Sequence, residues 1–160
     1  MVESSAISRL IRAGLVTGVT DGLFSSVLSA FFYGSTVTRL FQGVASVLIG
    51  AAALDGGART AALGVLMHFG VAFAWSLLFL LIVLGSSWMR GAIASPLGVI
   101  GVAAIYGPLI WIAMSMAIVP MFTHRPPTIN FRWWVQLVGH FPFVGLPIVA
   151  MIARTSSGPF

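Results

Sequence analysis

Three ionisable residues lie inside long apolar stretches of this sequence: Asp21, His68 and His140. A titratable side chain in hydrocarbon costs a few kcal/mol on insertion scales, so it is expected to face the interior of a helix bundle and to have a partner. With about 1.5 Å of rise per helical residue, the two histidines lie at similar depths, and Asp21 falls within roughly 6 Å of them if the chain crosses four times. We therefore expect the three side chains to share one buried polar region.

Three kinds of chemistry suit these residues. The first is hydrogen bonding that joins helices, from a neutral histidine to Asp21, a serine or a backbone carbonyl. The second is a proton or ion path through Asp21, His68 and His140, because histidine titrates near neutral pH. The third is axial ligation of haem b or a chlorophyll-type pigment by His68 or His140. Small residues near the two histidines would leave room for such a macrocycle: Gly64, Ala72, Gly139 and Gly145.

The composition excludes several classes of protein. The chain has 160 residues, of which 59% are hydrophobic and 7% are charged, whereas a soluble domain is about 25% charged. A soluble enzyme, a disordered chain and a nucleic-acid binder are therefore excluded. No cysteine is present, which removes thiolate metal sites and iron–sulfur clusters. No motif places a nucleophile beside a base, so we predict neither an enzyme nor a metal site.

The apolar stretches predict an all-α fold, a polytopic bundle that forms one transmembrane domain over residues 1–160. The four predicted spans are 7–32, 58–84, 96–119 and 131–153. A short re-entrant or interfacial helix is predicted over residues 37–54. The uninterrupted apolar run within it, 44–54, has only 11 residues, which is too few to cross the membrane. The alternative is five spans, which the distribution of arginines between the two sides favours. Ser95 before Pro96, and Asn130, are predicted helix caps.

Small and interfacial residues predict how these helices are held. Glycines spaced for one helix face allow the close backbone approach that drives helix association in lipid. Aromatic and polar residues at helix ends are typical anchors at the membrane interface. The predicted packing residues are Gly14, Gly18, Gly22, Gly64, Gly98 and Gly101, and the predicted anchors are Arg39, Gln42, Trp133 and Trp134.

One stretch resembles a pattern in small uncharacterised bacterial inner-membrane proteins. It begins at Arg39, Gln42, Ala45 and Ser46, continues through Gly50, Gly56, Gly57 and Gly64, and ends at His68 and Phe69. The resemblance covers about residues 39–69 and implies a multi-pass protein of the bacterial inner membrane. It implies no catalytic or binding residue.

The expected function is that of a non-catalytic subunit or accessory factor in a larger membrane assembly. The expected partners are the lipid bilayer and either other membrane proteins or further copies of this chain, and not nucleic acid. Two alternatives remain open: a proton or ion path or small transporter that works as an oligomer, and a protein that binds haem b or a pigment. No cofactor follows from the residues alone.

Overall fold

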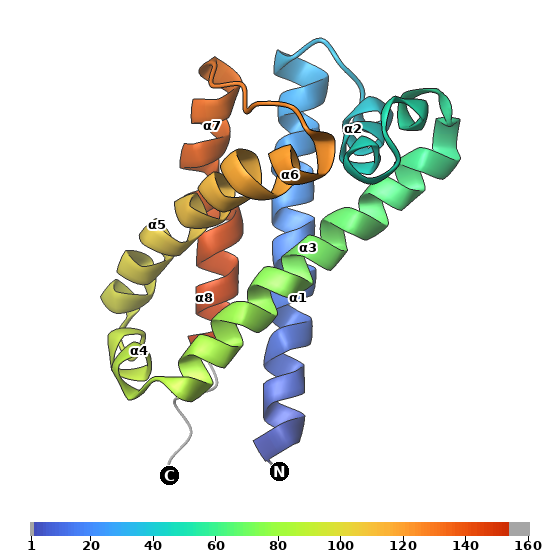
Figure 1. The fold of residues 1–160 in the computed structure, drawn as a ribbon. Coiled ribbons are helices and arrows are strands. Elements are labelled where there is room, and N and C mark those ends of the chain that lie inside the picture. The colour runs from blue at the N-terminus through green and yellow to red at the C-terminus, as the bar shows by residue number, and fades with distance from the viewer. Residues whose placement is uncertain (1, 154–160) are drawn as a thin grey trace.

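The chain folds into a bundle of helices in the computed structural model, which describes residues 2–153 (Figure 1). Residue 1 and residues 154–160 of the predicted domain lie outside the described residues. Four helical segments are long and apolar enough to cross a membrane: Ala6–Phe32, Gly57–Gly85, Pro96–Thr123 and Phe131–Ala153. No strand occurs within residues 2–153. The chain is a multi-pass membrane protein, and the predicted all-α bundle of four spans is confirmed.

Eight α-helices make up these segments and their connections within residues 2–153. They are α1 (Val2–Val27), α2 (Val37–Ile49), α3 (Gly57–Gly85), α4 (Ser87–Ala92), α5 (Pro96–Ala113), α6 (Val119–Thr123), α7 (Phe131–His140) and α8 (Leu146–Ala153). Turns of π-helix lie at Leu28–Phe32, Met114–Ile118 and Phe141–Gly145, and a 3₁₀ turn lies at Ala51–Asp55.

Polar side chains start the helices where the sequence predicts them. The hydroxyl of Ser95 accepts a hydrogen bond from the backbone N–H of Gly98 at 3.1 Å, with Pro96 in the first helical position. The side chain of Asn130 accepts one from the N–H of Trp133 at 3.2 Å and starts α7. Each cap satisfies a backbone donor that the first helical turn leaves without a partner.

Prolines perturb the last two spans without ending them. The third span continues to Thr123, past the predicted end at residue 119, because Pro120 lies in the first turn of α6 after a π-helical turn, where its missing N–H is tolerated. In the last span, Pro147 has no N–H to donate to the carbonyl of Phe143, four residues earlier. The Thr20 hydroxyl of α1 donates to that carbonyl at 2.6 Å, so a side chain from another span replaces the lost bond.

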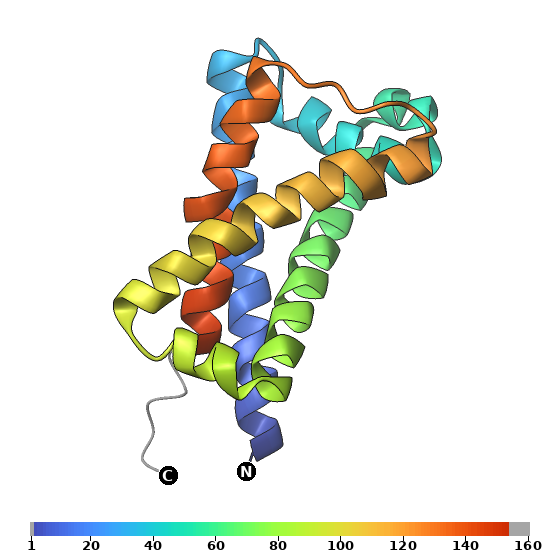
Figure 2. The ribbon, with the colours of Figure 1, turned by 60° about the vertical axis from the view of Figure 1, so that its left-hand side comes forward.

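Helix α2 is too short to be a fifth span. Its 13 residues cover about 20 Å, against a hydrocarbon core of about 30 Å. The helix lies across the direction of α1, near the end of the bundle where α1 finishes (Figures 1 and 2), and it packs mainly on the first half of α3. The five-span alternative is therefore not supported, and the short helix predicted over 37–54 is present as α2 and the 3₁₀ turn.

The apolar core occupies one half of the bundle. Helices α1 and α8 lie side by side there, with the end of α3 and the beginning of α5 against them (Figures 1 and 2). The core residues include Phe79, Val83, Ile148, Val149 and Ile152, all nearly inaccessible. The other half of the bundle, toward α2, α6 and the beginning of α7, has no comparable cluster of buried apolar side chains among the described residues.

Glycines of α1 and α3 bring the helices close together. A Cβ at Gly14 or Gly18 would overlap the rings of Phe73 and Phe69 on α3, and one at Gly22 would lie 3.3 Å from the ring of His68. A Cβ at Gly64 would overlap the backbone carbonyl of Phe41 on α2. These four predicted packing glycines lie at helix contacts.

The two predicted packing glycines of α5 do not join membrane spans. Gly98 lies against the carbonyl of Ala92 in the turn between α4 and α5, so its contact is local. Gly101 is exposed, and no described atom lies within 4 Å of the position of its Cβ. The prediction for Gly101 is wrong within this chain, because the face of α5 that packs carries Ala103 and Gly107 instead.

Candidate functional site

A cavity of about 800 Å³ lies in the half of the bundle that the apolar core leaves free. Its walls come from all four spans and from α2, and the loop between α6 and α7 also lines it. Two of the three π-helical turns contribute lining residues, Met114, Ser115 and Val144 among them. Such turns are frequent at functional sites because they displace side chains from regular helix positions.

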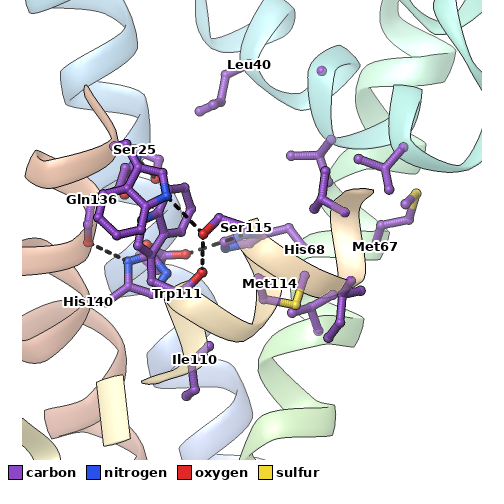
Figure 3. Close-up of a pocket in the computed structure, with 18 of the residues that line it drawn as sticks. Ser25, Leu40, Met67, His68, Ile110, Trp111, Met114, Ser115, Gln136 and His140 are labelled. Carbon is purple, nitrogen blue, oxygen red and sulfur yellow. Dashed lines mark hydrogen bonds and ion pairs between the residues drawn. The ribbon is translucent and has the colours of Figure 1, made fainter. Parts of the chain in front are cut away.

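Polar and apolar side chains line different parts of this cavity. Figure 3 shows Ser25, Gln136 and His140 gathered on one side, with Leu40 and Met67 away from them. The three ionisable residues predicted to share a buried region, Asp21, His68 and His140, all line the cavity.

Asp21 and His68 form a pair between α1 and α3. His68 Nε2 lies 2.9 Å from the carbonyl oxygen of Gly18, and since a carbonyl only accepts, Nε2 carries a proton. His68 Nδ1 faces Asp21 Oδ2 at 3.9 Å. This separation is within the range of an ion pair but longer than a direct hydrogen bond. Gly22 makes the approach of the ring to α1 feasible.

His140 is buried at the junction of α7 and the π-helical turn that follows, with 7% of its surface exposed. Its Nδ1 lies 2.8 Å from the carbonyl oxygen of Gln136, one turn earlier, so Nδ1 is the donor and Nε2 of the neutral ring keeps a lone pair. The ring packs on Trp111 of α5 with 4.9 Å between centroids.

A chain of hydrogen bonds links α7 to α5 beside these residues. The indole N–H of Trp133 donates to the hydroxyl of Ser115 at 3.0 Å, and that hydroxyl donates to the carbonyl of Trp111 at 2.7 Å. The indole N–H of Trp133 therefore has its partner inside the bundle, and the role of Trp133 as an interfacial anchor stays a prediction. Trp134, the next residue on the helix, is 54% exposed and lies on the outer face.

Arg39 and Gln42, the other predicted anchors, hold α2 against the turn that precedes α3. Arg39 Nη1 donates to the carbonyl of Leu54 at 2.8 Å. Gln42 is 5% exposed, and its side-chain amide donates to the carbonyl of Gly57 at 3.1 Å. The Gln42 side chain is thus buried, and its amide is held at the first residue of α3.

Arginines stand near the end of the cavity where α7 begins. Arg132 lies over the ring of Tyr33 at 4.3 Å from its centroid. Tyr33 itself follows the π-helical turn that ends the first span. Arg125 belongs to the α6–α7 loop, and all three residues line the cavity. The end near the loop is therefore basic and aromatic.

Several residues that line the cavity also carry a buried polar atom with no hydrogen-bond partner among residues 2–153. These residues come from α1, α5 and α7 and from the end of the first span, and the atoms are Thr17 Oγ1, Asp21 Oδ1, Tyr33 OH, Trp111 Nε1 and Gln136 Oε1. A buried polar atom without a partner costs about 1–3 kcal/mol. Because each of these atoms is almost completely covered, the atoms themselves do not face the cavity.

Three of the four small residues predicted to leave room for a macrocycle pack against protein instead. A Cβ at Gly139 would overlap the ring of Phe24, and one at Gly145 would overlap the carbonyl of Ala103. A Cβ at Gly64 would overlap the carbonyl of Phe41 in the same way. The fourth, Ala72, lines the cavity. His68 uses Nε2 for the Gly18 carbonyl.

Sequence reasoning overlooked Gln136, Trp111 and Ser115. Gln136 was detectable, since it is a side-chain amide inside an apolar span and lies one helical turn before His140. The rule that buried polar side chains face the bundle interior applies to it as it does to Asp21. Trp111 and Ser115 give no such signal, because tryptophan and serine are common on every face of a membrane helix.

No protein-family model, curated protein or solved structure matches this chain. The resemblance over residues 39–69 therefore stays an expectation from the sequence.

Proposed function

We propose that this protein binds a lipid-soluble organic molecule in the membrane, inside the cavity between its four spans. The observation that carries the proposal is the cavity itself, whose lining combines polar side chains such as Asp21, His68 and Gln136 with apolar ones such as Leu40 and Val44. A subunit that only fills space in an assembly has no use for such a cavity. The volume of about 800 Å³ also falls in the range of small-molecule sites, about 300–1,000 Å³.

Among the functions expected from the sequence, this proposal supports the small transporter that works as an oligomer. A binding site inside the membrane beside two neighbouring titratable side chains, Asp21 and His68, provides the two elements of a proton-linked carrier. We also propose the bacterial inner membrane as the location, on the resemblance over residues 39–69.

A tryptophan at Val44 tests the binding function. Val44 lies on α2 and lines the cavity, so a Val44→Trp side chain will fill part of it. The protein purified in mild detergent is expected to carry a bound organic molecule, detected by mass spectrometry of its solvent extract, and the variant is expected to lose at least nine-tenths of it. Leu66→Trp is the matched control, since Leu66 is 70% exposed on α3 and does not line the cavity.

The proposal fails if no organic molecule other than bulk lipid accompanies the protein, or if Val44→Trp and Leu66→Trp retain equal amounts. Thermal unfolding of both variants establishes that they are folded. If Val44→Trp does not fold, Val71→Trp is used instead, because Val71 lies on α3 and lines the same cavity.

The accessory-subunit function remains a second proposal, with another copy of this chain as the partner. It is favoured by a small-residue pair on the outer face of α3: Gly70 and Ala74 lie one turn apart, both are exposed, and no described atom lies within 4 Å of a Cβ at Gly70. Such pairs allow two helices to approach closely in lipid.

Self-association has a direct test in the mass of the purified protein. The protein is expected to be a dimer or larger by light scattering in mild detergent, and Gly70→Leu is expected to shift it to a monomer. Gly101→Leu, at an equally open glycine on α5, should leave the mass unchanged. A monomeric parent protein would contradict this second proposal and leave the ligand-binding proposal intact.

A further inference from the structure

Building on the proposed ligand-binding function, we propose that the ligand is a single-chain amphiphile with an anionic headgroup, a phosphate or a carboxylate. The headgroup lies at Arg125 and Arg132, and the chain lies along the apolar surface that α2 and α3 contribute to the cavity. The charge at one end of the cavity, the apolar part of its wall and the place of both relative to the membrane surface support this class.

The positive charge at the loop end of the cavity has no acidic partner. Arg125 and Arg132 line the cavity, and both residues are exposed. Arg132 lies over the ring of Tyr33, and neither arginine forms an ion pair with another residue of the described range 2–153. A guanidinium binds a phosphate or a carboxylate through two parallel N–H donors, so these arginines suit a ligand with an anionic group.

The carboxylate that lines the cavity lies deeper in the membrane than the arginines. It belongs to Asp21, which faces His68 at 3.9 Å, and it is the only acidic residue on the cavity wall among those described. Asp21 precedes Tyr33 by 12 residues of the first span, which corresponds to about 18 Å along the helix. An anion at the arginines is therefore separated from this carboxylate and close to two cations.

The beginning of α7 adds hydrogen-bond donors at the same end. Asn130 lines the cavity, and its side-chain oxygen accepts from the N–H of Trp133 at 3.2 Å. The amide NH₂ of Asn130 has no partner in the described part of the chain, and this group only donates. The positive end of the α7 dipole also favours an anion. A headgroup that only accepts hydrogen bonds matches these donors.

An apolar surface for the chain lies apart from the polar side chains. Leu40 and Val44 on α2 and Met67 and Val71 on α3 line the cavity, and Figure 3 shows Leu40 and Met67 away from Gln136. Helix α2 lies near the end of the bundle where the first span finishes (Figure 1), whereas the two α3 residues lie about 15–20 Å along that helix. The surface therefore extends from the membrane surface inward.

The size and the position of the cavity favour one chain with its head at the membrane surface. The volume of about 800 Å³ falls in the range of small-molecule sites, about 300–1,000 Å³, and a two-chain bilayer phospholipid is larger than such sites. The first span ends and α7 begins beside the arginines (Figure 1), so the anion stays at the level of the lipid headgroups. Burial of the anion in the apolar interior without a partner would be costly.

The test compares probes that share one chain and differ in the headgroup. The full chain in nanodiscs of a zwitterionic lipid is titrated by calorimetry at pH 8 with dodecyl phosphate, dodecanoate and dodecylphosphocholine. Empty nanodiscs supply the blank for partition into lipid. Dodecylphosphocholine keeps the phosphate but neutralises it with its own cation. We expect at least one anionic probe to bind at least tenfold more tightly than dodecylphosphocholine, and the tighter of the two identifies the headgroup. Inorganic phosphate and acetate, which lack the chain, should not bind.

The double variant Arg125→Gln/Arg132→Gln tests the place of the headgroup. It should weaken binding of the tighter anionic probe about tenfold and change binding of dodecylphosphocholine less than twofold, because the chain keeps its surface. Arg59→Gln is the matched control, since Arg59 is an exposed arginine at the beginning of α3 and does not line the cavity. This variant should bind the probes as the parent does. If the double variant does not fold, Arg125→Gln alone replaces it.

Equal binding of dodecylphosphocholine and both anionic probes overturns the anionic headgroup, and tight binding of inorganic phosphate or acetate overturns the amphiphile. An unchanged affinity in the folded arginine variant, or an equal loss in Arg59→Gln, overturns the assigned place. If any of these results appears while Val44→Trp still loses its co-purified molecule, the ligand class or its orientation is wrong and the binding function of the cavity stands. If Val44→Trp and Leu66→Trp retain equal amounts, the proposed function itself fails.

Discussion

Gly64→Ala is expected to destabilise the protein by about 3 kcal/mol, because an added methyl has nowhere to go. Its Cβ would overlap the carbonyl oxygen, carbonyl carbon and Cα of Phe41, which are backbone atoms of α2 and cannot rotate aside. Overpacking of this kind costs typically about 1–3 kcal/mol, and more where the backbone has to move. Helix α2 would have to move away from α3, and with it the cavity wall that contains Leu40 and Val44.

The measurement is equilibrium unfolding in detergent, followed by circular dichroism. Gly101→Ala is the control, since alanine there meets no described atom within 4 Å and gains helix propensity of up to about 1 kcal/mol. The two alanine substitutions should thus change the free energy of unfolding in opposite directions. A stability of Gly64→Ala within about 0.5 kcal/mol of the parent would mean that α2 does not pack on α3 in this way.

His68→Leu is expected to destabilise the protein by about 3 kcal/mol at pH 8, as measured by equilibrium unfolding in detergent. Leucine roughly keeps the volume of the side chain, but it removes the ring nitrogen that bonds the Gly18 carbonyl and leaves Asp21 without its neighbour on α3. Removing one member of a buried pair costs about 3–5 kcal/mol, and the partly accessible position of this pair places the expected loss at the lower end of that range.

The double variant Asp21→Leu/His68→Leu supplies the control, because it removes the charge together with its partner. It should be more stable at pH 8 than His68→Leu alone. The double-mutant cycle of the two residues should give an interaction free energy of at least 1 kcal/mol. Additive effects of the two single substitutions would show that the pair is not coupled.

The sequence predicts the elements of this fold closely because lipid imposes simple rules. A span needs about 20 apolar residues, so the four long segments could be placed from hydropathy, and the 13 residues of α2 identify it as too short. The caps at Ser95 and Asn130 follow from local chemistry, since a side-chain oxygen beside a helix start accepts from the first N–H groups. Both caps are present at the predicted residues.

The contacts of Trp133, Gln42 and Gly101 could not be predicted from the sequence, for one common reason. Hydropathy locates a residue along a span, but it does not say which side of a helix meets protein when every side is apolar. Trp133 and Trp134 are neighbours in sequence, yet the first donates a hydrogen bond to Ser115 inside the bundle and the second is exposed. Only the rotation of α7 relative to α5 separates them.

From the sequence alone come the membrane-spanning class, the number of spans and the similar depth of Asp21, His68 and His140, since depth follows from counting residues along a helix. The tertiary structure alone decides that these residues line one cavity, that Asp21 faces His68, and that Gln136, Trp111 and Ser115 join them. The physical reason is that contacts between spans depend on helix tilt and rotation. Those are set by which glycines admit which neighbours, as Gly22 admits His68 and Gly64 admits Phe41.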